Sequence, residues 1–301
     1  MRIALCGLAA AILPALALTA GAAEPEKYTL RYQFHPGETI RWNVEHRSMI
    51  RASVSGTTQD TETVSLSMKA WRVGAVQPDG TATIEHRVEW VDMRQRLKDS
   101  KEVHYDSRTD REPPPGFQTA ARSVGVPLSI LTMDATGKIL ARRQLVKPAA
   151  KDGAKPAETP LGDENWVTIP LPREPVPIGH TWSIPQTIDV PLEGGMVKRI
   201  KAVQQFTLEE VKTGVATIRF STDVLTPVTD PMVESQLVQR ESVGRVRFDI
   251  DEGRILSQQI DIDKHVVGFR GDASSIHYVN RFSERLAPAE PQSAARPSER
   301  R

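Results

Sequence analysis

The chain contains two stretches of similar sequence, and this internal duplication constrains its fold more than any other feature. Gly80–Ile84 (GTATI) is repeated as Gly214–Ile218 (GVATI), in each case just after a turn and at the start of a strand-like segment. Two further pairs of short matches keep the same order along the chain: Gly37–Trp42 with Gly179–Ile184, and Gly137–Leu140 with Gly253–Leu256. Three matches in one order predict an internal repeat of a single structural unit.

The repeated segments carry the pattern of half-buried strands. After Gly80 the residues alternate between an apolar and a polar side, and the apolar side holds Ala82, Ile84, His86, Val88 and Trp90. A period of two with β-branched and aromatic residues is typical of a strand that packs on one face. In the second copy Phe220 stands where the first copy has His86.

Turn signals divide each copy into hairpins, and helical signals are scarce. Glycines mark the turn before each repeated strand, and Gly137 and Gly253 mark a second hairpin in each copy. Only the segment 117–124 reads as a short helix. We therefore predict an all-β fold of two similar antiparallel β modules, arranged as a duplicated part-open barrel or as sandwich-like sheets.

The beginning of the chain has the features of a secretory signal peptide. A positive start at Arg2 is followed by an apolar run (Ile3–Leu18) and then by small residues, and this run is too short to span a membrane. We expect residues 1–23 to be cleaved and the protein to be exported to the periplasm or the extracellular space. The only cysteine, Cys6, lies in this segment, so the exported chain is expected to have no disulfide.

Composition divides the remainder of the chain into four segments. Residues 24–146 and 164–286 are predicted to form β modules 1 and 2. Residues 147–163 are rich in Ala, Lys, Pro and Gly and are expected to form a flexible linker or loop. Residues 287–301 are expected to be a disordered tail. Whether the two modules share one core is left open.

The charge balance bears on the partners of the protein. The chain has 39 Lys and Arg against 38 Asp and Glu, and loss of Arg2 with the signal peptide leaves 38 of each. A balanced chain has no electrostatic means of attracting nucleic acid or an anionic membrane surface. We expect no nucleic-acid partner and no membrane span, and the oligomeric state is left open.

Two segments resemble an uncharacterised family of secreted, β-rich bacterial proteins. Pro172–Trp182 (PREPVPIGHTW) has the Pro-rich approach, the glycine and the tryptophan typical of that family. The opening Tyr28–Trp42, with its Tyr-x-x-x-Tyr-x-Phe and Pro-Gly-Glu motifs, is similar to the start of its members. The resemblance implies a secreted β-rich protein. It assigns no activity and no functional residue.

The sequence carries no catalytic signature. It has no Gly-x-Ser-x-Gly, His-Glu-x-x-His, phosphate-loop or Gly-x-Gly-x-x-Gly motif. Asp261, Asp263 and His265 alternate along one predicted strand, where same-face neighbours form a row instead of converging on a metal ion. We expect a solvated polar face there, no catalytic residues, no metal site and no cofactor.

Four residues are candidates for ligand contact: His86, Trp90, Trp71 and Phe220. His86 lies on an apolar face, where it is either a core or rim histidine or a ligand-contacting group. Trp90 is predicted to face inward. Trp71 is out of phase with Leu66 and Met68 and is predicted to face outward, and both tryptophans serve either packing or ligand contact.

These features favour a non-catalytic, secreted or periplasmic binding module that holds a hydrophobic or peptide ligand on a curved β-sheet. The alternative is an envelope structural or adaptor protein that binds another polypeptide along a sheet edge. A hydrolase is the third possibility, because catalytic groups can be assembled in space without a sequence motif.

Overall fold

The computed structural model describes residues 25–146 and 168–288, and within them the predicted all-β fold is confirmed. The predicted signal peptide (1–23), the predicted linker (147–163) and all but the first two residues of the predicted tail lie outside the described residues. The strands are β1 (Lys27–Tyr28), β2 (Thr39–Val54), β3 (Thr57–Val76), β4 (Ala82–Leu97), β5 (Val103–Asp106), β6 (Pro127–Met133), β7 (Ile139–Gln144), β8 (Val176–Pro177), β9 (Thr181–Pro191), β10 (Val197–Lys212), β11 (Val215–Val224), β12 (Val243–Asp249), β13 (Arg254–Val267) and β14 (Ser274–Leu286). The helices are α1 (Gln118–Ser123), η1 (Glu193–Gly195) and α2 (Pro231–Leu237).

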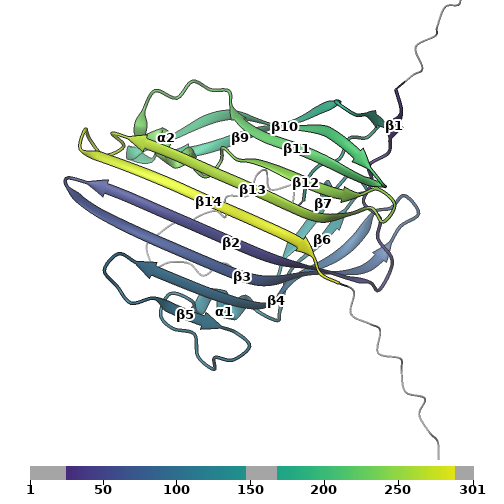
Figure 1. Ribbon diagram of the computed structural model, residues 1–301, viewed down its shortest axis with the longest axis horizontal. Helices are drawn as coiled ribbons and strands as arrows, with labels where there is room; N and C mark the ends of the chain where they lie inside the picture. Colours follow the sequence, from purple (N-terminus) through teal and green to yellow (C-terminus); the bar gives the residue numbers. More distant parts are fainter. Residues whose placement is uncertain (1–24, 147–167, 289–301) are drawn as a thin grey trace, which may run out of the picture.

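Twelve of the strands form one antiparallel sheet made of two consecutive meanders. Its strand order is β7-β6-β4-β3-β2-β14-β13-β12-β11-β10-β9, with β5 added beside β4. The first meander contains β2 to β7 and the second contains β9 to β14, and they join where β14 pairs with β2. The sheet curls so that β6 and β7 pass behind β12 and β13 in the view of Figure 1.

The repeated sequence motifs occupy equivalent places in the two meanders. Gly80 and Gly214 lie in the turns β3–β4 and β10–β11, and Gly137 and Gly253 lie in the turns β6–β7 and β12–β13. All four have positive φ, the backbone conformation that favours glycine. The duplication seen in the sequence therefore corresponds to two similar runs of antiparallel strands.

An N-terminal strap (Leu30–His35) connects the two meanders at one end of the sheet. The Tyr32 N–H donates to the Ala135 carbonyl in the β6–β7 turn at 2.8 Å, and the Gln33 N–H donates to the Gly253 carbonyl in the β12–β13 turn at 3.0 Å. Strap residues and residues from both meanders form a single buried cluster, which includes Leu30, Tyr32, Trp42, Trp71, Ile84, Leu131, Phe206, Ile218, Phe220 and Phe248. The described parts of the two predicted modules thus share one core.

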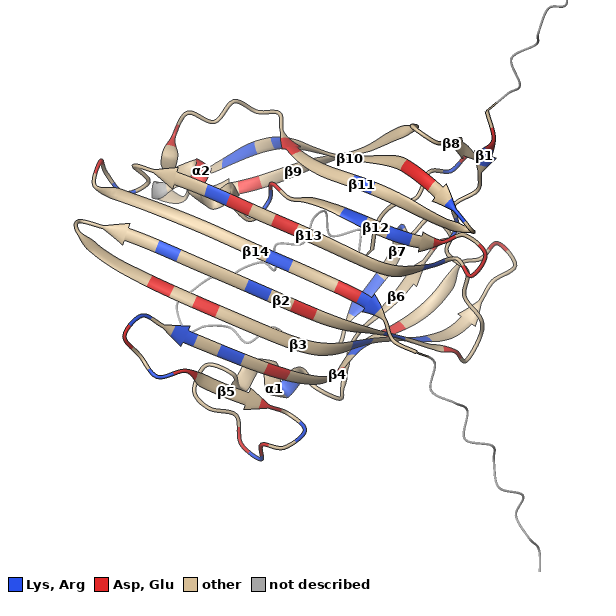
Figure 2. Ribbon diagram, in the orientation of Figure 1, with Lys and Arg blue, Asp and Glu red and all other residues tan. Residues whose placement is uncertain are grey.

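The two faces of the sheet differ in chemistry. We call the face that carries this core the inner face and the opposite face the outer face. The outer face carries cross-strand ion pairs such as Arg281–Asp261 at 2.6 Å and Arg51–Asp60 at 2.9 Å. Figure 2 shows the charged positions along β2, β13 and β14. The arginine side chains of these pairs are 60% and 59% exposed, so the outer face is in contact with water.

Two helical segments cover parts of the inner face away from the main core. Val233 and Leu237 of α2 pack on β9 and β10 in a second buried cluster. Tyr105 and Phe117, next to α1, pack on Val91 of β4 in another. The inner face of β2 and β3 lies between these two covers. None of the helices in the described residues is long and apolar enough to cross a membrane.

Candidate functional site

The inner face of β3 carries a stripe of polar side chains that leads away from the core. Alternation along the strand places Thr61, Thr63, Ser65, Ser67, Lys69 and Trp71 on this face, and we call these six residues the β3 stripe. Its four hydroxyl residues are half-buried, and none makes a side-chain hydrogen bond within residues 25–146 and 168–288. A half-buried hydroxyl without a protein partner remains able to bind water or a ligand.

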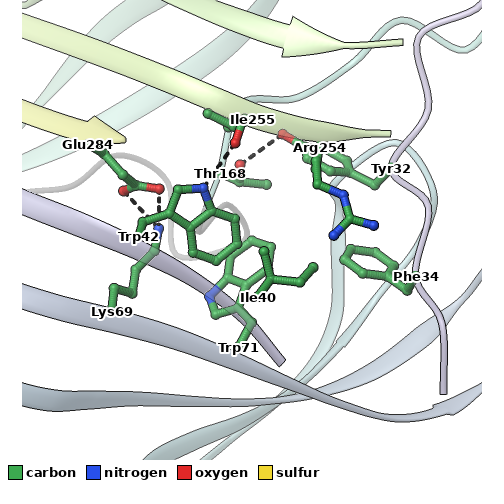
Figure 3. A pocket seen from close by; sticks show the side chains of 10 residues that line it. All are labelled: Tyr32, Phe34, Ile40, Trp42, Lys69, Trp71, Thr168, Arg254, Ile255 and Glu284. Carbon is green, nitrogen blue, oxygen red and sulfur yellow. Dashed lines mark hydrogen bonds and ion pairs between the residues drawn. The ribbon is translucent and has the colours of Figure 1, made fainter. Parts of the chain in front are cut away.

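The stripe meets the core at a buried ion pair. The Lys69 ammonium donates to both oxygens of Glu284, at 2.7 and 2.8 Å, and the two side chains are 16% and 2% exposed. Gln258 adds a third hydrogen bond to this carboxylate at 3.3 Å. The ammonium also lies over the rings of Trp42 and Trp71, 4.6 and 5.2 Å from their centroids (Figure 3). Both the carboxylate and the faces of the two indole rings attract the ammonium group.

A cavity of about 10 Å³ lies beside this ion pair, and it is lined by Tyr32, Phe34, Ile40, Trp42, Lys69, Trp71, Thr168, Arg254, Ile255 and Glu284 (Figure 3). A volume of this size holds about one water molecule. The Trp42 indole N–H donates to the Ile255 carbonyl at 3.0 Å, whereas the buried Trp71 N–H has no hydrogen-bond partner in the described part of the chain. This end of the sheet is therefore filled by its own side chains.

A second polar pair continues the inner face on the neighbouring strands. His46 of β2 lies directly opposite Ser65, and its Nε2 contacts the Asn280 side-chain oxygen of β14. Asn280 is buried, and the His46 ring lies 6.4 Å from that of Phe282. Hydrogen-bonding groups thus cover neighbouring inner-face positions of three adjacent strands.

His86 lies on the inner face of β4, directly opposite Trp71. Burial, reinforced by the positive charges of Lys69 and Arg142, lowers the pKa of His86 to about 4. Arg142 of β7 is on the same face, because it pairs with the buried Leu131 of β6. It is exposed, and it forms no ion pair within the described residues. His86 is therefore neutral near pH 7 and is flanked by two cations.

The low pKa of His86 predicts a specific acid sensitivity. Between about pH 6.5 and pH 4 the unfolded chain binds a proton at His86 that the folded chain does not, so the free energy of unfolding falls as the pH falls through this window. We expect His86→Phe, which installs the residue of the second copy, to lose less stability than the unaltered protein between about pH 7 and pH 4.5. Urea unfolding at both pH values measures the difference, and an equal loss in the two proteins would contradict the assignment.

The predicted orientations of Trp71 and Trp90 are both wrong. Trp71 is 2% exposed and packs in the main core, while Leu66 is 37% exposed on the outer face. The error arises because the inner side of β3 is polar where it leaves the core. In β4, Trp90 pairs with Met68 and Val88 pairs with Lys69, so the extra residue Glu89 reverses the alternation.

The four predicted ligand-contact residues lie in different surroundings. His86 and Trp71 are neighbours on adjacent inner-face strands. Trp90 is on the outer face, where the Arg108 guanidinium lies 4.2 Å from its ring centroid. Phe220 is 3% exposed and packs against Phe206 with their centroids 5.8 Å apart. The structure therefore brings two of the four together and places the other two elsewhere.

The polar row on β13 forms an ion pair and a hydrogen bond with its neighbouring strand. Asp261 binds Arg281 at 2.6 Å, and Asp263 binds His277 at 2.7 Å. The ring centroids of His265 and His277 are 5.6 Å apart. Within the described ranges, no group of three or more His, Cys, Asp or Glu residues is placed to hold a metal ion.

The fold and the site define an all-β protein with one large antiparallel sheet, a second sheet of two short strands, and a polar stripe on the inner face of the large sheet. No family model and no curated protein matches the chain. Among solved structures, the chain is similar to lipovitellin, in a structure described as showing lipid–protein interactions, with a TM-score of 0.42 and 13% identity. The alignment covers 87% of this chain and 27% of that chain, so the protein spans about a quarter of the length of lipovitellin.

Proposed function

We propose that the protein is a non-catalytic binding module that acts after export and holds an extended peptide along the inner face of β3. The observation that carries this proposal is the row of four half-buried hydroxyl groups, at Thr61, Thr63, Ser65 and Ser67, that the described residues leave without partners. Groups of this kind on a concave face are typical of polar recognition.

The spacing of the hydroxyl groups fits a peptide in an extended conformation. Same-face neighbours on a strand are about 6.8 Å apart, since each residue adds about 3.4 Å. An extended peptide repeats its backbone N–H and C=O groups with the same two-residue period. A peptide lying along β3 can therefore place one backbone group at each hydroxyl without a change of register.

An apolar ligand fits this face less well than a peptide. The apolar end of the inner face is filled, since its cavity measures only about 10 Å³. Next to this filled end, the inner face carries the hydroxyl groups of the β3 stripe together with His46 and Asn280. An acyl chain bound there would remove these polar groups from water without offering them hydrogen bonds. These two observations favour the peptide over the hydrophobic ligand.

In the alternative, in which the protein is an adaptor, another polypeptide would pair with a free edge of the sheet instead of lying on the inner face. The free edges of the main sheet are β7, β9 and the four-residue strand β5, which pairs with β4 alone. β9 contains Pro185 and Pro191, which have no backbone N–H to donate to an added strand. β7 is short, at six residues. Both features make edge pairing the second candidate.

Removal of two hydroxyl groups tests the proposed site. We expect Ser65→Ala/Ser67→Ala to weaken retention of a random hexapeptide pool about tenfold or more, because each lost hydrogen bond is worth about 0.5–1.5 kcal/mol. Size-exclusion separation followed by mass spectrometry measures the retained peptides. The matched control is Ser275→Ala/Ser283→Ala, which removes two serine hydroxyls from the outer face of β14 and should retain full binding. Equal loss in both variants, or binding by neither form of the protein, would overturn the proposal.

A further inference from the structure

Two histidines lie directly opposite one another on the outer face of the sheet. His265 of β13 pairs with His277 of β14 in the antiparallel register, and the two strands run side by side (Figure 1). Their ring centroids are 5.6 Å apart, and the ring planes are inclined by 64°. Side chains directly opposite on an antiparallel pair have Cβ atoms only about 4.5–5.5 Å apart, so both imidazoles can reach one point above the sheet.

A carboxylate holds one of the two rings. The Nε2 of His277 lies 2.7 Å from Oδ1 of Asp263, which is two positions before His265 on the same face of β13. An ionised carboxylate only accepts hydrogen bonds, so the Nε2 of neutral His277 carries the proton and its Nδ1 keeps a free lone pair. A carboxylate that accepts from the other ring nitrogen is the usual partner of a metal-binding histidine, because it fixes the tautomer and orients the ring.

The remaining nitrogens of both rings are available to a ligand. Neither His265 nor the Nδ1 of His277 makes a hydrogen bond in the part of the chain that the structure describes. Arg51 of β2, which lies opposite His277, binds the Asp60 carboxylate at 2.9 and 3.1 Å, so its charge is balanced. His265 is exposed and the His277 side chain is 35% exposed, so an ion in solution can reach both.

The separation of the rings fits two ligands of one metal ion. Imidazole nitrogens bind Zn²⁺ at about 2.0–2.1 Å, which places the centroids of two rings about 5 Å apart around a tetrahedral ion. A small rotation of the exposed His265 side chain closes the difference from the observed 5.6 Å. Two protein ligands are fewer than the three or four of catalytic and structural zinc sites, so water completes the coordination.

We propose that His265 and His277 form a binding site for a divalent transition-metal ion, with Asp263 as the positioning residue of His277. Imidazole is a ligand for Zn²⁺, Ni²⁺ and Cu²⁺, and a nitrogen site generally binds Cu²⁺ most tightly of the three. The bound ion joins the two strands of the β13–β14 hairpin and keeps positions open to water. The site lies on the face opposite the β3 stripe, so it does not depend on the proposed peptide binding.

Titration of the full chain, made without a histidine tag, with Cu²⁺ tests the site by calorimetry and electron paramagnetic resonance. We expect one bound Cu²⁺ whose spectrum shows coupling to two imidazole nitrogens. A partner of a metal ligand is worth about 10–100-fold in affinity, so Asp263→Asn should weaken binding about tenfold while both nitrogens remain. Loss of a ligand itself, in His265→Gln or His277→Gln, should weaken binding by about a hundredfold or more and leave one nitrogen.

His104→Gln provides the comparison for these variants. The Nε2 of His104 on β5 lies 2.9 Å from Asp92, so this residue repeats the histidine–aspartate pair, with no second histidine in ring contact among the described residues. Its substitution should leave the Cu²⁺ affinity and the two-nitrogen spectrum unchanged. Absence of Cu²⁺ binding, a single-nitrogen spectrum in the unaltered protein, or equal weakening in His104→Gln and His265→Gln would overturn the proposal. Unchanged affinity in Asp263→Asn would overturn the positioning role of that carboxylate.

Discussion

Glu284→Ala is expected to lower the free energy of unfolding by about 3–5 kcal/mol, because it leaves a buried ammonium without its counter-charge. Lys69 is 16% exposed, and both of its short contacts to oxygen are with Glu284. The rings of Trp42 and Trp71 would remain near the ammonium, but cation–π contacts are worth only about 0.5–2 kcal/mol and do not replace a carboxylate.

Urea unfolding of three variants measures this effect. The double variant Lys69→Met/Glu284→Leu should recover most of the loss, since apolar residues of similar volume remove both charges together. Asp189→Ala breaks an outer ion pair whose side chains are 75% and 60% exposed, and it should cost no more than about 0.5 kcal/mol. If Glu284→Ala lowered the free energy of unfolding by less than about 1 kcal/mol, the prediction would be wrong, because the buried pair would then contribute no more than an exposed ion pair.

The repeat and its hairpin turns could be predicted from the sequence because their signals are local. A glycine with positive φ and a two-residue alternation each depend on residues within one turn or one strand. The predicted helix at 117–124 is confirmed as α1, at Gln118–Ser123. The second helix, α2, was missed although Asp230 caps it by accepting the Met232 N–H and Pro231 begins it, both of which are ordinary helix-start signals.

The orientations of the tryptophans could not be predicted because they depend on non-local features. A single extra residue, Glu89, reverses the phase of β4, and nothing in the sequence marks it as a bulge. The β3 stripe is visible in the sequence as hydroxyl residues at alternate positions from Thr61 to Ser67. The apolar residues Leu66 and Met68, which are out of phase with Trp71, indicate the opposite face of the strand as the buried one.

The positive charges that act on His86 could not be predicted without the sheet register. Arg142 follows His86 by 56 residues in the sequence, yet only β6 lies between the two strands that carry them. The buried pair of Lys69 with Glu284 is formed in the same way, across β2, the strand that joins the two meanders. Sequence patterns define faces of single strands, whereas these groups meet because particular strands are neighbours.

Gly253→Ala is expected to cost several kcal/mol and to weaken the connection between the two meanders. A Cβ atom on Gly253 would lie 2.5 Å from the backbone nitrogen of Gln33 and 2.7 Å from the carbonyl oxygen of Arg31. Both are backbone atoms of the strap, so a side-chain rotation cannot relieve the overlap. The strap would have to move, and the hydrogen bond from the Gln33 N–H to Gly253 would be lost with it.

Gly37→Ala is the matched control, since it separates this overlap from the cost of the backbone conformation. Gly37 has a φ of +82° and Gly253 a φ of +57°, but no atom lies within 4 Å of the position of a Cβ on Gly37. The control should therefore lose only about 1–2 kcal/mol, the cost of a left-handed conformation for a residue with a Cβ. Thermal or urea unfolding of the two variants gives the comparison. Equal losses would mean that the strap is not held against the β12–β13 turn, and the shared core of the two meanders would then need another explanation.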